Sequence, residues 1–452
     1  MEDLNNDINP FTRRKFMKGS ALAVGGILAS NLGASAHVFG KDEPIKIATI
    51  GCGGRGTGAT VQALSTDQNL QLVAMCDAFR DRLDNSYNNI TSNKDLQTKA
   101  ESDKKFALKK RINVPEEHKF VGFDGYKKAI DLADVVIIAT PPGFRPIHFE
   151  YAIDNNKHVF MEKPLATDAP GVRKILEVAE EAKQKKLNVV VGLQRHYQTV
   201  YKELMKRIHD GAIGDITSAQ AYWNGGGVWT RERQPGMTEM EYQMLNWYYF
   251  NWLCGDHIVE QHIHNLDVIN WAKNGYPVSA QGMGGREVRT GNEHGEIFDH
   301  HYVEFTYDDG SIMNSQCRHI RGCWNKVGEQ MTGTKGRADN SGTIYDLKGN
   351  IIWKHRDRND PNPYQQEHDE LFAAVANGEY KFADAENGAK STMTSILGRM
   401  CTYSGQVIKW DEAINSEVSL MPERFAWDAT PPVVPNEDGS YPVPVPGETK
   451  VL

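Results

Sequence analysis

In the first half of the chain, apolar runs alternate with amphipathic stretches, which predicts a parallel sheet covered by helices. Residues 45–50 (IKIATI) are mostly apolar or β-branched, and similar runs occur in QLVAMCD, ADVVIIATPP, HVFMEKP and LNVVVGLQRHY. Continuous apolar runs are typical of strands buried on both faces, and helical stretches between strands imply crossover connections. We therefore expect an α/β fold whose first domain covers residues 44–194.

The pattern changes after residue 214, where apolar and polar residues alternate as in half-buried strands. ITSAQAYWN predicts one strand, HHYVEFTYDDGSIMNSQCRH predicts a hairpin that turns at Asp309-Gly310, and GTIYDLKGNIIWK predicts a second hairpin. Two helices are expected after them, one ending at Gly378 and a longer one around residues 387–407. We assign residues 195–425 to a second domain and residues 426–452 to a proline-rich tail that extends over the surface.

The first 36 residues have the layout of an export signal. TRRKFMK places an arginine pair ahead of Phe16, and the short apolar run ALAVGGILAS leads to an Ala-x-Ala site that ends at Ala36. This layout predicts a twin-arginine signal peptide over residues 1–36 and a periplasmic protein that is exported folded. The alternative is a membrane anchor, but about ten apolar residues are too few for a bilayer that needs about 20.

Composition excludes some classes of partner. The 452 residues carry a formal net charge of -8, which argues against nucleic-acid binding because that needs a basic surface. No later stretch is long and apolar enough for a membrane-spanning helix. The six cysteines contain no CxxC pair, so a zinc framework is not expected.

A glycine motif follows the first predicted strand. Gly51, Gly53 and Gly56 in IGCGGRG fit G-x-G-x-x-G, and a helical stretch follows them. The first glycine allows a tight turn, the second lets the backbone approach a pyrophosphate, and the third allows close packing of helix and strand. The free N–H groups of the helix N-terminus then attract phosphate. Together these features predict a dinucleotide-binding Rossmann domain, although a similar turn can occur without a ligand.

An acidic residue at the end of the second predicted strand favours NAD. Asp77 lies 21 residues beyond Gly56, where a carboxylate accepts hydrogen bonds from the adenosine ribose. The same carboxylate repels a 2′-phosphate, so NADP is disfavoured, although Arg80 could offset this repulsion. Ligands of parallel sheets bind at the carboxyl ends of the strands. The candidate cofactor-binding residues there are Gly51, Gly53, Gly54, Arg55, Gly56, Asp77, Thr140, Pro141, His148, Glu162, Lys163, Gln194 and Arg195.

Six stretches carry a family resemblance: IGCGGRG, the CD dipeptide at 76–77, ATPPGFRPIH, KHVFMEKPLA, VGLQRHY and EQHIHNLDVINW. Through them the chain resembles the Gfo/Idh/MocA oxidoreductases over roughly residues 45–410. The resemblance implies an N-terminal Rossmann domain and a C-terminal α/β domain built on an open, mostly antiparallel sheet. In that family the second sheet commonly forms the subunit interface, so we expect a homo-oligomer. The resemblance also implies that an EKP lysine and a later Asp-x-x-x-His pair surround the substrate carbon beside the nicotinamide.

Matched position by position, these catalytic residues are Lys163, His264 and, in place of the commoner Asp, Glu260. The residue types support the same trio. Glu260 and His264 are four residues apart, so on one helix they share a face, where the carboxylate fixes the imidazole tautomer. His264 then accepts the hydroxyl proton as general base, and the Lys163 ammonium stabilises the negative charge that develops on oxygen.

A metal site is the alternative interpretation of this histidine-rich segment. On a continuous helix His262 and His264 point about 200° apart and cannot chelate one ion. His257, Glu260 and His264 could share one face, but HExxH spacing is absent. We therefore predict that no metal is bound.

Aromatic residues between positions 222 and 252 suggest the substrate. Planar rings stack on the apolar faces of a pyranose, although Trp and Tyr also fill cores and interfaces. Together with the family resemblance, they favour a sugar or a sugar-like polyol. The candidate substrate residues are Tyr197, Trp223, Trp247, Asp256 and His257.

The leading hypothesis is an NAD-dependent oxidoreductase that acts on a hydroxyl of a sugar or glycoside. Because soluble NAD is scarce outside the cytoplasm, we expect a tightly held cofactor that is recycled in place by a second substrate. The alternative is a glycoside-cleaving enzyme that uses NAD transiently and passes through a ketosugar. A sugar-binding protein that retains NAD only structurally is disfavoured by the presence of Lys163 and His264.

Overall fold

The computed structural model describes residues 43–103, 106–357 and 359–452. The predicted signal peptide at 1–36 lies outside the described residues. Among the helices of the described part, none is both long and apolar enough to cross a membrane.

The first sheet has six strands, all parallel, in the order β3-β2-β1-β4-β5-β6. This order is that of a doubly wound dinucleotide-binding fold, so the predicted fold class is confirmed for this half. The strands are β1 (Ile45–Ile50), β2 (Leu70–Asp77), β3 (Lys119–Val121), β4 (Val135–Ile138), β5 (His158–Met161) and β6 (Val189–Val191). The helices around them are α1 (Gly54–Leu64), α2 (Arg80–Thr91), α3 (Lys94–Ser102), α4 (Leu108–Arg111), α5 (Gly125–Asp131), α6 (Arg145–Asp154) and α7 (Ala169–Gln184).

The second sheet has nine strands in the order β14-β13-β12-β11-β7-β10-β9-β8-β15. Only β7 and β10 pair in parallel among its neighbours, so the predicted mostly antiparallel sheet is confirmed. Both predicted hairpins form, and the first turns at Gly310, whose φ is +80°. The strands are β7 (Ile216–Gly225), β8 (Ser279–Gly285), β9 (His300–Thr306), β10 (Ile312–His319), β11 (Lys326–Gly333), β12 (Gly336–Asp339), β13 (Thr343–Asp346), β14 (Ile351–Lys354) and β15 (Ile408–Lys409).

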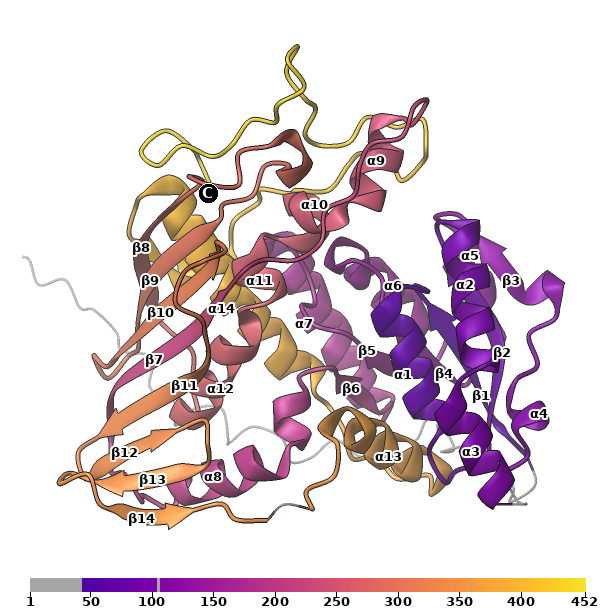
Figure 1. Cartoon of the computed structure of the whole chain (residues 1–452), viewed down its shortest axis with the longest axis horizontal. Helices are drawn as coiled ribbons and strands as arrows, with labels where there is room; N and C mark the ends of the chain where they lie inside the picture. The colour runs from indigo at the N-terminus through magenta and orange to yellow at the C-terminus, as the bar shows by residue number, and fades with distance from the viewer. Residues whose placement is uncertain (1–42, 104–105, 358) are drawn as a thin grey trace, which may run out of the picture. The chain divides into compact units, whose positions relative to one another are not determined.

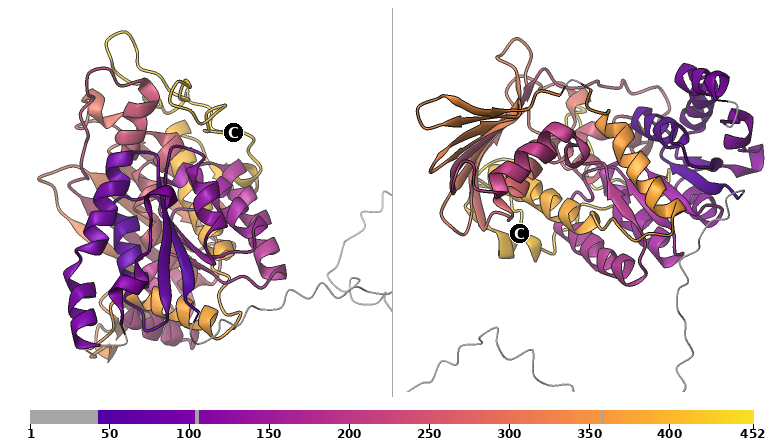
Figure 2. Two further views of the ribbon diagram at one scale, coloured as in Figure 1. Left: turned by 90° about the vertical axis from the view of Figure 1, so that its right-hand side faces the viewer. Right: turned by 90° about the horizontal axis from the view of Figure 1, so that it is seen from below.

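Helices fill the space between the two sheets, as Figure 1 shows for α7, α12 and α14. The helices of this half are α8 (Thr199–His209), α9 (Glu239–Leu245), α10 (Asn251–Cys254), α11 (His257–Glu260), α12 (Ile263–Lys273), α13 (Pro363–Ala376), α14 (Ala385–Ser404) and α15 (Trp410–Ile414). The helix α14 is buried over most of its length because it packs on β8, β9 and α7. The other face of the nine-stranded sheet points outward (Figure 2), where Met283 is 73% and Trp324 61% exposed.

The core of the first sheet includes residues from far along the chain. Leu371, Phe372 and Val375 of α13 join the same apolar cluster as the strands and α1, beside which α13 lies in Figure 1. Residues 382–384 then run parallel to β6, with Val189 and Ala383 paired. The predicted boundary at residue 194 therefore does not enclose the whole core of the first sheet.

The tail at 426–452 forms no helix or strand. It is not wholly on the surface as predicted, because Tyr441 is buried and its ring lies 5.0 Å from that of Phe250. The backbone of Val433 also accepts a hydrogen bond from Gln243, at 2.7 Å. These contacts attach the tail to the segment that contains α9 and α10.

Replacing Gly56 with alanine is expected to destabilise the fold by about 1–3 kcal/mol, the usual cost of overpacking. A Cβ at Gly56 would lie 1.9 Å from the carbonyl oxygen of Gly51, where the α1 backbone crosses the end of β1. Gly54→Ala is the matched control because nothing lies within 4 Å of its Cβ. Urea unfolding of the nucleotide-free proteins gives the free energy of unfolding of both variants. Equal midpoints for the two would contradict the close approach of the backbones.

Candidate functional site

The glycine turn between β1 and α1 borders a cavity of 460 Å³. Gly51 has a φ of +94°, and a Cβ there would lie 2.6 Å from the backbone nitrogen of Thr140. Gly53 and Gly54 have nothing within 4 Å of a Cβ, so their backbone faces open space. Of the candidate cofactor residues, this cavity is lined by Gly51, Gly53, Gly54, Arg55, Asp77, Thr140, Pro141 and His148.

The N-terminus of α1 suits the phosphates of a dinucleotide. Its N-cap, Gly53, has no side chain to accept the free N–H groups, and the first turn carries no acidic residue. These N–H groups and the helix dipole therefore remain available to an anion. The open backbone at Gly53 and Gly54 leaves room for it. The residues present thus fit the pyrophosphate of NAD.

Asp77 lies at the end of β2 beside the same cavity. Its carboxylate accepts hydrogen bonds from the backbone N–H of Cys52 at 2.7 Å and of Phe79 at 2.9 Å. Burial raises the pKa of Asp77, and those two N–H groups oppose the shift. Arg80 does not offset its charge, because the Arg80 guanidinium binds Asp84 and Glu116. This arrangement is consistent with NAD as the cofactor.

A second cavity, of 320 Å³, contains all three predicted catalytic residues. Lys163, Glu260 and His264 line it together with Glu162 and Gln194. The two cavities share Arg55, Ala139, Thr140 and Trp247 in their walls. The proton-transfer groups are therefore next to the dinucleotide cavity, at the carboxyl ends of β4, β5 and β6.

Lys163 is held from the second half of the chain. Its ammonium donates to the main-chain oxygen of Glu260 and to its carboxylate, the latter at 3.1 Å. Both side chains are largely buried. A buried ion pair holds its two side chains more rigidly than a surface ion pair does, because neither group is freely solvated. The lysine is thus fixed with its charge at the cavity wall.

Glu260 and His264 do not share a helix, contrary to the prediction. The helix α11 ends at Glu260 and α12 begins at Ile263, so the chain turns between the two residues. The Glu260 carboxylate binds Lys163 rather than the imidazole, and Nδ1 of His264 has no hydrogen-bond partner among the described residues. The expected carboxylate–imidazole pair is therefore wrong, although both groups reach the same cavity.

His264 is a neutral imidazole at neutral pH. Burial, followed by the positive charges of Lys163 and Arg195, lowers its pKa well below the usual value of 6.5. The ring of Trp223 stacks on it, with centroids 5.9 Å apart and planes 25° apart. A neutral, unpartnered imidazole in a cavity wall can accept a proton from a hydroxyl group.

The remaining candidate cofactor residues have varied surroundings. Glu162 forms an ion pair with Arg55. His148 is buried with its Nδ1 3.2 Å from the hydroxyl of Thr140, and burial lowers its pKa to about 3. Arg195 is paired with the buried Glu329 and does not line either cavity. Its charge acts at the site by lowering the pKa of His264.

The candidate substrate residues divide into two groups. Trp223 and Trp247 line the second cavity. Tyr197 does not line it, because its hydroxyl donates to Asp384 at 2.6 Å, near the end of β6. Asp256 and His257 are also absent from its walls, because both are completely buried.

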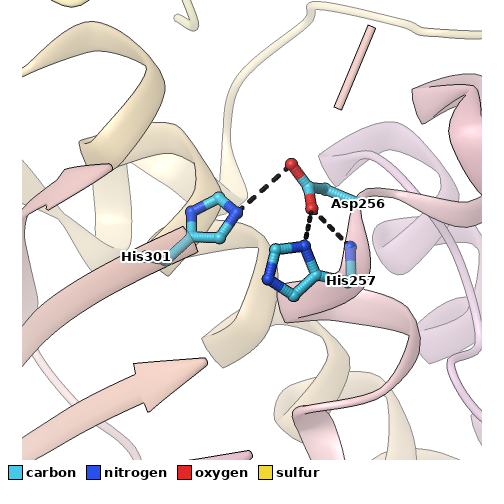
Figure 3. Close-up of side chains that lie close together, drawn as sticks. All are labelled: Asp256, His257 and His301. Atoms are coloured by element: carbon cyan, nitrogen blue, oxygen red, sulfur yellow. Dashed lines mark hydrogen bonds and ion pairs between the residues drawn. The ribbon is translucent and has the colours of Figure 1, made fainter. Parts of the chain in front are cut away.

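Asp256 and His257 belong to a buried cluster with His301, shown in Figure 3. One carboxylate oxygen of Asp256 lies 2.7 Å from Nδ1 of His257, and the other lies 3.2 Å from Nε2 of His301. A metal ion could fit between ligand atoms at such distances. However, the Asp256 carboxylate already accepts from the Tyr403 hydroxyl at 2.5 Å and from the backbone N–H of Phe298 at 3.0 Å. These donors satisfy the Asp256 carboxylate, whereas both ring nitrogens of His257 and Nε2 of His301 have no hydrogen-bond partner among the described residues.

Arg145 and Gln261 are wall residues of the second cavity that were not predicted from the sequence. Arg145 is buried, its Nε and Nη1 have no partner among the described residues, and burial lowers its pKa to about 10. It therefore stays cationic at neutral pH. Its position four residues after Pro141, near a strand end, was the only signal in the sequence.

Residues 45–193 match the sequence model of the Gfo/Idh/MocA family, described as an oxidoreductase family with an NAD-binding Rossmann fold. The chain is 34% identical over 137 residues to an inositol 2-dehydrogenase of Gluconacetobacter diazotrophicus, covering 30% of this chain and 34% of the relative. It is 23% identical over 232 residues to a glycosyl hydrolase family 109 protein of Streptomyces coelicolor, covering 46% and 44%. The match thus spans less than half the length of either relative.

Scyllo-inositol dehydrogenase of Lactobacillus casei, solved with NAD(H) and scyllo-inositol, has a similar fold. The TM-score is 0.59 at 17% identity, over 82% of this chain and 100% of that one. The likeness supports the fold. Residues 45–193 are thus similar to the Gfo/Idh/MocA oxidoreductase family, whose model describes an NAD-binding Rossmann fold.

Proposed function

We propose that the protein is an NAD-dependent oxidoreductase that acts on a hydroxyl group of a sugar or polyol. One observation carries the proposal: Lys163, Glu260 and His264 line one cavity that shares walls with the dinucleotide cavity. NAD, when bound, supplies the acceptor for a hydride from carbon. The residues of the glycine turn, with Asp77 and Thr140, would hold it.

In this proposal His264 takes the proton of the substrate hydroxyl. Its imidazole is neutral because burial and nearby cations disfavour the charged form. Nδ1 is buried and has no partner among the described residues, so we assign the substrate proton to Nε2. Removing the O–H proton is required as the carbon loses hydride, and a positioned base accelerates that step.

Lys163 stabilises the negative charge that develops on the same oxygen. Its ammonium is fixed by the main-chain oxygen and the carboxylate of Glu260. Fixed charges on largely buried side chains interact more strongly than charges in water and need no reorganisation during the reaction. Glu260 therefore acts as a positioning residue for the lysine.

The aromatic walls support a carbohydrate substrate. Trp223 and Trp247 line the cavity, and Trp223 stacks on His264. Indole rings favour the apolar face of a sugar ring, and Gln194 and Gln261 offer amides to its hydroxyls. The two similar inositol dehydrogenases agree with a polyhydroxylated ring as the substrate class.

We further propose that the protein acts in the periplasm with a tightly held cofactor. The twin-arginine layout of residues 1–36 supports export of an already folded protein. Because free NAD is scarce there, one sugar would be oxidised and a second substrate reduced on the same cofactor. Self-association through the outer face of the nine-stranded sheet is supported by the exposed Met283 and Trp324.

A second candidate is a glycoside-cleaving enzyme that passes through a ketosugar. It is favoured by the similarity to the glycosyl hydrolase family 109 protein. Oxidising a ring carbon to a ketone acidifies the neighbouring C–H bond and allows the aglycone to leave. Return of the hydride then completes a cycle without net oxidation.

A single assay distinguishes the two candidates. Purified holoprotein is mixed with candidate sugars and aryl glycosides, the near-ultraviolet absorbance of reduced nicotinamide is recorded, and the products are analysed. Reduced cofactor with a ketosugar is expected for the oxidoreductase. Released aglycone without net reduction would support cleavage instead. Neither signal across sugars, polyols and glycosides would overturn the proposed function.

A further inference from the structure

The wall of the dinucleotide cavity is completed from the second half of the chain. Residues 226–238, between β7 and α9, form a segment here called the β7–α9 segment. Its Trp229 and Arg231 line the same 460 Å³ cavity as Gly53 and Gly54. Nothing in the Rossmann motif requires this contribution, because the glycine turn and Asp77 both lie in residues 45–77.

The β7–α9 segment is anchored on both sides of Trp229. The carbonyl oxygen of Val228 accepts a hydrogen bond from the Tyr249 hydroxyl at 3.1 Å. The backbone N–H of Arg231 donates to the buried side chain of Asn246 at 2.8 Å. Asn246 is itself held by the carbonyl oxygen of Glu293, at 2.7 Å. The positions of residues 228–231 are therefore fixed by the structure around them.

The side chain of Arg231 carries a charge that the described residues do not neutralise. It lies over the Trp229 ring, 4.9 Å from the centroid, and forms no ion pair among the described residues. It also lines a neighbouring cavity together with Gly53, Gly54 and Arg82, so it is close to the N-terminus of α1. Arg82 and Arg231 thus line one space together with Asp81 and the N-terminus of α1.

We propose that Arg231 binds the pyrophosphate of NAD opposite the glycine turn, with Trp229 as a platform that holds it there. The inference rests on the NAD-binding fold and not on sugar oxidation. Arginine forms bidentate, charge-assisted hydrogen bonds with phosphate oxygens. A cofactor bound between the glycine turn and the β7–α9 segment leaves slowly, because contacts from both halves of the chain must break.

The test measures cofactor release directly. Purified protein is loaded with NADH, and excess alcohol dehydrogenase with acetaldehyde then oxidises only the NADH that dissociates. The decay of NADH fluorescence gives the release rate. Arg231→Ala is expected to release NADH about 10- to 100-fold faster than the natural protein, the usual effect of losing a charge-assisted hydrogen bond. Trp229→Ala is expected to accelerate release to a smaller extent.

Arg233→Ala is the matched control. Arg233 lies in the same segment, but its guanidinium binds Glu239 and the Tyr441 hydroxyl and does not line the cavity. Its loss should leave the release rate unchanged. Added salt should accelerate release from the natural protein more than from Arg231→Ala, because it screens the arginine–phosphate pair. Circular dichroism and thermal melts establish that each variant is folded.

Three results would overturn the inference. In the first, Arg231→Ala releases NADH at the natural rate. In the second, Arg233→Ala accelerates release as much as Arg231→Ala, which would indicate general loosening of the segment. In the third, the natural protein binds no NADH. Release as expected with no oxidation of any sugar would refute the proposed function but leave this inference intact.

Discussion

Replacing Lys163 with alanine should reduce turnover by about 100- to 1,000-fold or more while leaving bound NAD in place. That range is typical for removing a group that stabilises developing negative charge on oxygen. The ammonium is fixed by Glu260 at the wall of the second cavity, and the glycine turn that we propose for the phosphates does not line that cavity. Steady-state kinetics and the NAD content of the purified protein measure the two effects.

Lys127→Ala is a suitable control, because Lys127 is a surface lysine whose ammonium pairs with the exposed Asp124. The turnover of Glu260→Gln should lie between that of the natural protein and that of Lys163→Ala, since the main-chain oxygen of residue 260 still holds the Lys163 ammonium. Full activity of Lys163→Ala would exclude the lysine from the reaction.

His264→Ala is expected to lower kcat by about 100-fold or more, the range for loss of a general base. The effect should fall mainly on kcat, because the imidazole acts on the hydroxyl proton during the reaction. His368→Ala would be a poor control because that imidazole is part of the buried core, whereas His209→Ala removes an exposed imidazole away from both cavities. A variant with unchanged kcat would assign the proton to another group.

The pH dependence follows from the same imidazole. Burial, Lys163 and Arg195 lower the pKa of His264, so the neutral form that accepts a proton persists as the pH falls through 6.5. The acid limb of kcat/KM should therefore lie well below pH 6.5 in the natural protein and disappear in His264→Gln. An acid limb centred at pH 6.5 would indicate a solvated histidine instead.

Features that depend on neighbouring residues could be predicted from the sequence. The glycine turn and the EKP lysine follow strands rich in apolar residues, and Asp77 is the last residue of another such strand. In a parallel sheet the carboxyl ends of strands meet at one edge, so these residues had to converge. The Asp309-Gly310 hairpin was predictable for the same reason, because a glycine at positive φ favours the turn.

Features that depend on distant packing were not predictable. The break between α11 and α12 separates Glu260 from His264, yet no proline or glycine marks it in EQHIH. The ion pair with Lys163 involves residues 97 positions apart. Arg231 lies in a polar stretch without periodicity, and only the hydrogen bonds of Val228 and Asn246 place it at the cavity. Spacing along the chain contains none of this information.

The contribution of α13 to the first sheet has a consequence for how the halves of the chain depend on one another. A fragment ending at residue 194 would expose the surface that Leu371, Phe372 and Val375 cover, and the edge of β6 would lose its partner at Ala383. Such a fragment should aggregate or remain partly unfolded, and adding the complementary piece, residues 195–452, should rescue its solubility. The nucleotide-binding half is thus no autonomous module, and grafting it onto another protein would require carrying residues 363–384 along with it.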